Sequence, residues 1–320
     1  MTPTVSICLT TYNRASVLPA TVDSLLAQSF EDFELIINDD CSPDGTEALC
    51  RAYMARDPRV KYFRNANNLK MPGNLNAAIG HATGQYIANV HDGDLYRPDL
   101  IARWKAALDA NPRAAFVFNR YEVYDREGNA RIENAPIEQS GDRMTIARQF
   151  FDVMTSCVWG TVMARRDAYA AVGPFDPVYG FISDVDMWLR LARDWEVAYV
   201  PEPLITITPR ELDHPYAFVN WRFWFFTFPM YVTHLRYYRD ALPDEVARSS
   251  ASYARKRRRL LLRDVAICVK HRRWDRLREG LAIFRDAPDT VLRALGRAFG
   301  RSSDAPAWYA PEQWARTEVG

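Results

Sequence analysis

The chain has 320 residues, of which 48% are hydrophobic and 25% charged, and its formal net charge is +1 at pH 7. This length and apolar content allow a full core, so the composition excludes an intrinsically disordered protein and indicates one large domain or two small ones. The cysteines are odd in number and have no metal-ligand spacing, which excludes a disulfide framework and a zinc site and predicts a reducing, cytosolic setting. They are Cys8, Cys41, Cys50, Cys157 and Cys268.

The first strand is predicted over Thr4–Thr10, a short run of β-prone apolar residues. It ends at the polar stretch Thr11–Arg14, and the following helix carries Leu18, Val22 and Leu25 on one face. The sequence begins without a basic region followed by a long apolar run, so we expect neither a signal peptide nor a membrane anchor there.

A second strand, Phe33–Asn38, leads into Asp39–Thr46, where Asp, Ser, Pro and Gly favour a turn. Ser42 or Asp44 in this turn would cap the next helix, Glu47–Arg56, by accepting a hydrogen bond from one of its first N–H groups. The unit of strand, polar loop and helix is therefore repeated.

The pattern continues with a strand over Val60–Arg64, a helix over Asn74–His81 and a strand over Tyr86–Val90 that runs into His91–Asp94. Strands that alternate with helices of this length predict an α/β fold, with a Rossmann-like, mostly parallel sheet flanked by helices on both faces. Ligands bind such sheets at the carboxyl ends of the strands.

Polar residues follow three of these strands, at Thr11–Arg14, at Asp39 with Asp40, and at Asp92 with Asp94. An ordinary turn or helix cap explains any one of them alone, but three strand ends that converge on one edge predict a ligand site. Asp92 and Asp94, separated by one glycine, suit a hard divalent cation that also binds phosphate oxygens. Such a cation neutralises a departing diphosphate, as cleavage of a sugar–phosphate bond requires.

Other phosphate chemistries lack their motifs. The sequence contains no Gly-x-x-x-x-Gly-Lys-Ser/Thr loop and no Gly-x-Gly-x-x-Gly after the first strand, which argues against nucleoside-triphosphate hydrolysis and dinucleotide redox chemistry. It also contains no Gly-x-Ser-x-Gly elbow, which argues against a serine hydrolase.

The middle of the chain continues with predicted strands over Ala114–Tyr124 and Thr155–Arg165, separated by a helix over Met144–Met154. After a turn at Gly173–Asp176, a further helix begins near Ser183.

This further helix has two acidic residues, Asp184 and Asp186, in its first turn. Acidic groups there interact favourably with the helix dipole, so N-terminal capping is the alternative to a functional role. Trp188 is either a core residue or a platform for a sugar ring.

Beyond Pro203 the composition becomes aromatic and then basic. The most apolar stretch, Phe223–Val232, is far shorter than the ~20 residues that cross a bilayer. Residues 255–301 hold 15 Lys and Arg against 5 Asp and Glu. Amphipathic helices with this excess fit an anionic membrane surface, a solvated face or a self-association surface. No recognised module accompanies them, so we expect no nucleic-acid partner.

Five motifs occur in a fixed order: Val5–Arg14, Asn38–Thr46, Gly84–Ile87, Gly173–Asp176 and Asp184–Arg190. This ordered set resembles family 2 of the GT-A glycosyltransferases, and the likeness covers roughly two thirds of the chain. The resemblance implies a GT-A catalytic domain over residues 1–215, divided into a nucleotide-sugar half at 1–110 and an acceptor half at 111–215. An aromatic and then basic helical extension would occupy residues 216–320.

The resemblance also implies roles for the residues at the first two strand ends. Thr11 and Tyr12, with Arg14 in the same loop, would lie against the nucleotide. Asp39, in preference to Asp40, would accept a hydrogen bond from the base imide, which fits uracil or thymine.

At the third strand end, the resemblance implies that Asp92 lies near the ribose or diphosphate and that Asp94 ligates Mn²⁺ or Mg²⁺, with Asp92 as a second metal ligand. His214 would complete the metal site, or would be an ordinary surface histidine. The sequence here is His91-Asp92-Gly93-Asp94 where the family often has Asp-x-Asp-Asp, so His91 is a further candidate for this site.

On the acceptor side, the resemblance implies that Asp184 is the general base that takes the proton of the attacking hydroxyl, in one displacement that inverts the anomeric centre. Asp186 and Trp188 would contact the acceptor or serve the core. One departure concerns the base: Ser183 replaces the glutamate that usually precedes it. Another concerns the phosphate contacts, because Leu75 replaces an arginine of the phosphate-side helix.

The sequence therefore predicts an inverting, metal-dependent glycosyltransferase that moves a sugar from a nucleoside diphosphate sugar to a glycan or glycolipid. The resemblance places it in bacterial surface polysaccharide synthesis, in the cytoplasm or at the inner face of the membrane. A catalytically silent sugar-nucleotide or glycan binding protein is the alternative, and a nucleotidyltransferase is a more distant one, because its Gly-rich, Arg-containing phosphate loop is missing.

Overall fold

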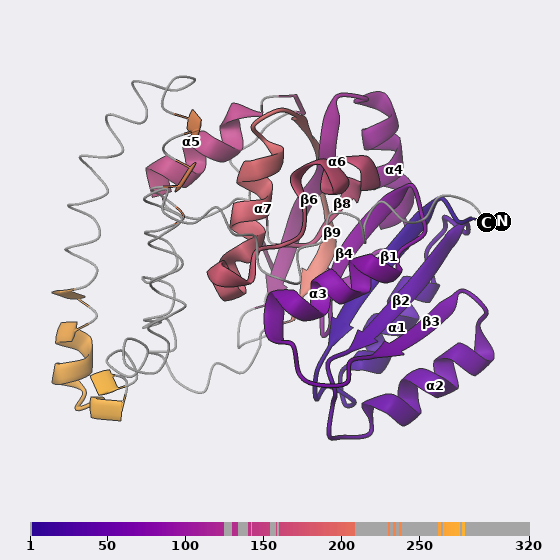
Figure 1. The fold of residues 1–320 in the computed structure, drawn as a ribbon, viewed down its shortest axis with the longest axis horizontal. Helices are drawn as coiled ribbons and strands as arrows, with labels where there is room; N and C mark the ends of the chain where they lie inside the picture. Colours follow the sequence, from indigo (N-terminus) through magenta and orange to yellow (C-terminus); the bar gives the residue numbers. More distant parts are fainter. Residues whose placement is uncertain are drawn as a thin grey trace.

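The computed structural model describes residues 2–124, 130–133, 140–141, 143–153, 158 and 160–208, together with scattered positions between 230 and 278. In this part of the chain, nine strands form one mixed sheet that is flanked by helices (Figure 1). The predicted α/β fold is confirmed.

The nine strands are β1 (Val5–Thr11), β2 (Phe33–Asp39), β3 (Val60–Arg64), β4 (Tyr86–His91), β5 (Leu95–Tyr96), β6 (Ala114–Tyr124), β7 (Ala130–Glu133), β8 (Val162–Arg165) and β9 (Glu196–Ile207). The helices are α1 (Leu18–Leu26), α2 (Thr46–Arg56), α3 (Lys70–His81), α4 (Leu100–Ala110), α5 (Met144–Val153), α6 (Arg166–Val172), a 3₁₀ helix (Pro177–Ile182) and α7 (Ser183–Leu191).

The strands lie in the order β3-β2-β1-β4-β8-β6-β9-β5, and β7 pairs with β6. The four strands β3, β2, β1 and β4 are parallel, which is the Rossmann-like half. Next to them β8 runs antiparallel to both β4 and β6, and β6 pairs in parallel with β9. The carboxyl ends of β1, β2 and β4 therefore share one edge, as expected.

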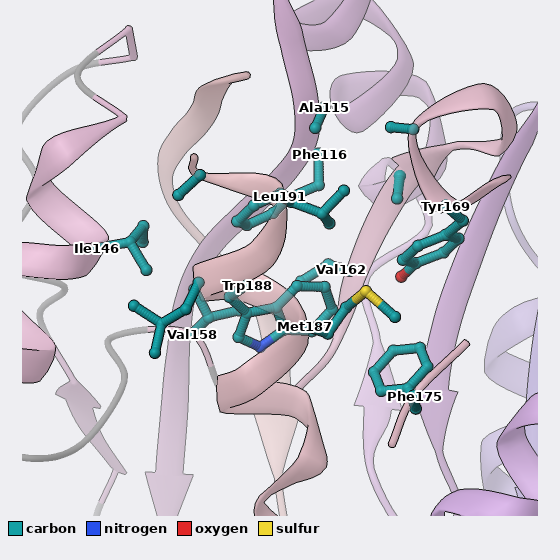
Figure 2. Packing of buried hydrophobic residues seen from close by; sticks show 14 of the residues in the cluster. Ala115, Phe116, Ile146, Val158, Val162, Tyr169, Phe175, Met187, Trp188 and Leu191 are labelled. Carbon is teal, nitrogen blue, oxygen red and sulfur yellow. The ribbon is translucent and has the colours of Figure 1, made fainter. Parts of the chain in front are cut away.

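Each face of the sheet has its own hydrophobic core. One contains residues of α1, α2 and α4, and the other contains residues of α3, α5, α6 and α7. Successive β1 residues alternate between them, because Ile7 and Leu9 face the first core and Cys8 faces the second. Figure 2 shows the second core, where Trp188 of α7 lies near Phe116 and Val162.

Local sequence signals predicted most element bounds. Asp44 Oδ1 accepts a hydrogen bond of 3.0 Å from the N–H of Thr46, where α2 begins. The helix predicted from Asn74 instead starts at Lys70, with a non-helical residue at Met71. Strand β8 begins at Val162 rather than at residue 155, after Gly160 with φ +87°.

The extension predicted over residues 216–320 falls mostly outside the described residues, as does His214. Of its described residues, Met230, His234 and Tyr238 are buried, and the first and last of these belong to the core that contains α5 and α7. No helix in the described part of the chain is long and apolar enough to span a membrane.

Candidate functional site

The strand register brings the predicted site residues together. Thr11 of β1 pairs with Asp39 of β2, and Thr10 pairs with His91 of β4. Asp39 also pairs with Arg64 of β3. Four neighbouring strands thus deliver hydroxyl, carboxylate, imidazole and guanidinium groups to one edge of the sheet.

Asp39 is completely buried, and both of its oxygens receive hydrogen bonds from the protein. Oδ1 accepts from the N–H of Ser42 at 2.9 Å. Oδ2 accepts from Tyr62 Oη at 2.8 Å and from Arg64 Nη1 at 2.6 Å. Burial and the hydrogen bond to Asp39 raise the pKa of Tyr62, so it remains a neutral donor. Sequence reasoning missed the partnership of Tyr62 and Arg64 with Asp39, although both lie in the predicted third strand.

Asp40 holds the loop between β3 and α3. Its Oδ1 accepts hydrogen bonds from Asn65 Nδ2 at 2.8 Å and from the N–H of Leu69 at 2.7 Å. Its Oδ2 accepts one from the N–H of Lys70 at 2.9 Å. Asp40 and Asp39 are both buried.

Three non-glycine residues around this edge adopt a left-handed backbone: Asn13 (φ +56°), Cys41 (φ +64°) and Lys70 (φ +61°). Each follows one of the parallel strands β1, β2 and β3. Such conformations cost about 1–3 kcal/mol each and concentrate at ligand sites. Here the hydrogen bond from Asn13 N–H to Ser42 Oγ, 2.8 Å, holds the first two loops together.

The loop after β1 presents two groups of different character. The Oγ1 of Thr11 is buried and has no hydrogen-bond partner among the described residues. Tyr12 is 45% exposed, which makes its ring available as a stacking surface for a planar ligand. Arg14 lies in the same loop and is half-buried.

Buried hydroxyl groups shape the loop after β4. Tyr96 Oη accepts a hydrogen bond from the N–H of His91 at 2.8 Å and donates one to the carbonyl of His91 at 2.9 Å. Thr21 Oγ1 donates to the carbonyl of Asp94 at 2.9 Å and accepts from the N–H of Gly93. Gly93 has φ +87°, which suits glycine. The loop is therefore rigidly positioned at the strand end.

The two aspartates of this loop differ in burial. Asp94 is 2% exposed and its Oδ2 lies 3.8 Å from Nδ1 of His91, whereas Asp92 is partly exposed. These carboxylates have the oxygen donors that Mg²⁺ and Mn²⁺ prefer. The described residues contain no group of three His, Cys, Asp or Glu that could hold a metal ion. A cation here would need further oxygens from a substrate, such as the two phosphates of a nucleoside diphosphate.

The predicted base lies next to this loop. A methyl group at Gly160 would approach Oδ2 of Asp184 to 3.1 Å and Cε1 of His91 to 3.1 Å. The carboxylate of α7 and the imidazole at the end of β4 therefore border the same small space. Sequence reasoning missed Gly160, because nothing local to residue 160 indicates its distant neighbours.

Burial raises the pKa of Asp184 to about 6, even though Oδ1 accepts a 2.8 Å hydrogen bond from the N–H of Val185. A carboxylate with a raised pKa is a stronger base than an exposed one. Its position and its pKa both suit proton transfer.

The other two α7 residues predicted for the acceptor site point into the protein. Asp186 is bound by Arg190 and His234. Trp188 is fully buried, with its ring centroid 5.0 Å from that of Phe116. In this structure Asp186 is held by polar partners and Trp188 belongs to the core, and acceptor contact through them stays a prediction.

Residues 6–173 match the glycosyl transferase family 2. The chain belongs to this family. It is 31% identical to the putative glycosyltransferase EpsE of Bacillus subtilis over 60% of this chain and 68% of that protein. It is also 32% identical to the GalNAc(5)-diNAcBac-PP-undecaprenol beta-1,3-glucosyltransferase of Campylobacter jejuni, over 41% of this chain and 42% of that protein.

The fold of this family 2 glycosyltransferase is shared by solved structures of low sequence identity. S. aureus TarS 1-349 in complex with UDP-GlcNAc superposes with a TM-score of 0.59 at 15% identity, over 73% of this chain and 66% of that chain. The mannosyltransferase PcManGT from Pyrobaculum calidifontis, in complex with GDP-Man and Mn²⁺, superposes with a TM-score of 0.51 at 16% identity, over 94% and 89%.

Proposed function

We propose that this glycosyltransferase moves a hexose from a nucleoside diphosphate sugar to a hydroxyl group of a glycan or glycolipid with inversion at the anomeric carbon. One observation carries the proposal. The carboxylate of Asp184 and the strand-end loop that begins at His91 border the same space at Gly160. A base and a diphosphate-binding loop on either side of one small space are what a single displacement requires.

The nucleotide would lie across the carboxyl ends of β1 and β2. The ring of Tyr12 is the exposed stacking surface there, and the buried Thr11 hydroxyl can turn to a ligand oxygen. Asp39 and Asp40 each receive three hydrogen bonds from the protein. Both are buried, so the assignment follows the family resemblance: Asp39, in preference to Asp40, would accept the imide N–H of uracil or thymine, which would make the donor a UDP- or dTDP-sugar.

The diphosphate would lie beside the loop after β4. Asp94 and Asp92 are the residues that would hold Mn²⁺ or Mg²⁺ together with the phosphate oxygens. When bound, the cation supplies positive charge that stabilises the leaving diphosphate. The GDP-Man and Mn²⁺ in PcManGT support this assignment by analogy of fold.

Asp184 would accept the proton of the acceptor hydroxyl as that oxygen attacks the anomeric carbon. The bond to the nucleoside diphosphate breaks on the opposite side, so no covalent enzyme intermediate is needed. A base that is partly buried keeps bulk water away from the attacking group, which favours transfer over hydrolysis.

A lipid-linked glycan at the inner face of a bacterial membrane is the proposed acceptor, as part of surface polysaccharide synthesis. The polyprenyl-linked substrate in the name of the C. jejuni relative supports this class. Described residues of the C-terminal region also combine exposed apolar and basic side chains, which suits an anionic lipid surface. The apolar ones are Leu262, Val269 and Trp274, and the basic ones are Arg263, Lys270 and Arg272.

Calorimetric titration with UDP, dTDP and GDP, each with and without Mn²⁺, tests the proposal. We expect one uridine or thymidine nucleotide to bind, more tightly with Mn²⁺, and we expect Asp94→Ala to lose the effect of the metal. Binding of GDP alone would contradict the assignment of uracil or thymine as the nucleobase. Binding without any turnover of the matching sugar donors would favour the catalytically silent binding protein.

A further inference from the structure

A buried hydrogen bond joins the helix of the proposed base to the C-terminal region. His234 is completely buried, and its Nε2 lies 2.9 Å from Oδ1 of Asp186. Asp186 lies two residues after Asp184, in the first turns of α7. The other oxygen, Oδ2, accepts a 2.8 Å hydrogen bond from Nε of Arg190. A single carboxylate of α7 is thus bound by two partners.

The surroundings of His234 define its proton position. Nη2 of Arg193 lies 3.2 Å from Nδ1, and a guanidinium can only donate, so Nδ1 is the acceptor. Nε2 then carries the proton and donates it to Asp186. Burial lowers the pKa of His234 and outweighs the opposite effect of Asp186, which agrees with a neutral ring.

Arg190 extends the network to the end of α6. Its Nη1 donates to the carbonyl of Val172 at 2.7 Å, and its Nη2 donates to that of Pro174 at 2.9 Å. Burial alone would raise the pKa of Asp186, but the charge of Arg190 and the hydrogen bond from His234 lower it to about 2. The carboxylate is therefore ionised and fixed between α6, α7 and the C-terminal region.

A second contact between the C-terminal region and α7 lies further along the helix. Tyr238 is 1% exposed, and its Oη donates a 2.6 Å hydrogen bond to the carbonyl of Leu189. It packs against Phe151 of α5 and does not touch the Asp186 network by any described hydrogen bond. The hydrogen bond of His234 reaches the first turns of α7, whereas that of Tyr238 reaches its last turn. Variants of the two residues can therefore distinguish loss of a contact to the C-terminal region from a specific effect on the first turns.

We propose that His234 is a positioning residue for the base: its hydrogen bond to Asp186 fixes the first turn of α7 and so directs Asp184 toward the space at Gly160. The catalytic part of this inference rests on the proposed function. The acceptor side of the site then depends on residues beyond the family-matched segment, because that segment ends at residue 173 and both Asp184 and His234 follow it.

Three full-length variants test the inference. His234→Ala removes the donor, and His234→Gln keeps an N–H donor near the position of Nε2. Tyr238→Phe is the matched control, because it removes the other hydrogen bond from the C-terminal region to α7. Hydrogen–deuterium exchange of residues 183–188 reports the first turns directly, and release of UDP from UDP-GlcNAc with Mn²⁺ reports the reaction.

For His234→Ala we expect exchange in residues 183–188 to rise about tenfold or more, and kcat to fall by a similar factor while KM for UDP-GlcNAc stays the same. His234→Gln should restore most of both, and Tyr238→Phe should change neither. Unchanged exchange in His234→Ala overturns the inference, as does an equal effect of Tyr238→Phe. If the wild type releases no UDP from UDP-GlcNAc, this sugar nucleotide is not the donor, and exchange still decides whether His234 holds α7.

Discussion

Two carboxylates two residues apart in α7 have opposite environments. Burial raises the pKa of Asp184 to about 6, and none of the described residues places a cation beside its carboxylate. Asp186 is also buried, but the charge of Arg190 and the hydrogen bond from His234 bring its pKa down to about 2. Carboxylates whose pKa values are driven apart in this way have different functions. Asp184 has the properties of a base, whereas Asp186 is a fixed anion.

The pKa of Asp184 predicts how the rate depends on pH. Below about pH 6 the carboxyl is protonated and cannot accept the proton of the attacking hydroxyl, so the rate should rise with pH up to this value and level off above it. Asp184→Asn should abolish turnover without changing nucleotide affinity. Rates of nucleotide release across this range, with calorimetry of the variant, check both. A rate that stays flat through pH 6 would contradict the role.

Gly160 is expected to be indispensable for a steric reason. A methyl group there would fill the space between Asp184 and His91, at 3.1 Å from each. Gly160→Ala should lower turnover about tenfold or more while UDP affinity is retained. Gly141→Ala is the control, because Gly141 also has positive φ, at +118°, but a methyl group there meets nothing within 4 Å. Equal turnover in the two variants would show that the space is not used.

At the scale of elements, local patterns predicted the parallel half well. The polar loops after β1, β2 and β4 follow strands whose register matches their expected order, so Thr11, Asp39 and His91 meet as the fold class requires. The insertion of antiparallel β8 between β4 and β6 was not predicted. Nor was the pairing of Asp186 with His234, 48 residues away. Both depend on long-range packing, which leaves no periodicity in the sequence.

Contact between β1 and the start of β4 depends on a second glycine. A methyl group at Gly84 would lie 2.6 Å from the backbone nitrogen of Ser6, which cannot move without disturbing β1. Gly84→Ala should therefore lower the free energy of unfolding by about 1–3 kcal/mol, as overpacking does. Gly80→Ala in α3 meets nothing within 4 Å and should leave stability unchanged or raise it by up to about 1 kcal/mol. Urea denaturation of both variants compares them, and equal midpoints would contradict the close approach.

At the scale of the whole molecule, charge is distributed unevenly, and the basic residues concentrate in the C-terminal third. If this region meets a membrane surface, the protein should sediment with vesicles that contain anionic lipid, and added salt should release it. Replacing Trp274 by Ser and Lys270 by Gln should weaken sedimentation. Arg113→Gln is the control, because Arg113 is an exposed arginine just before β6, far along the chain from the basic region. Equal sedimentation with uncharged vesicles would exclude an electrostatic contact.

The single sheet also limits how this enzyme can be recombined with its relatives. Strand β4 of the parallel half pairs with β8, and β5, which follows β4 in the chain, lies at the far edge of the sheet beside β9. Trp104 of α4 donates a 3.0 Å hydrogen bond to Asn119 of β6. A chimera joined near residue 110 would have to preserve both of these strand pairings and this hydrogen bond at once. New donor–acceptor combinations should therefore be sought by exchanging strand-end loops, with both halves of the sheet taken from one parent.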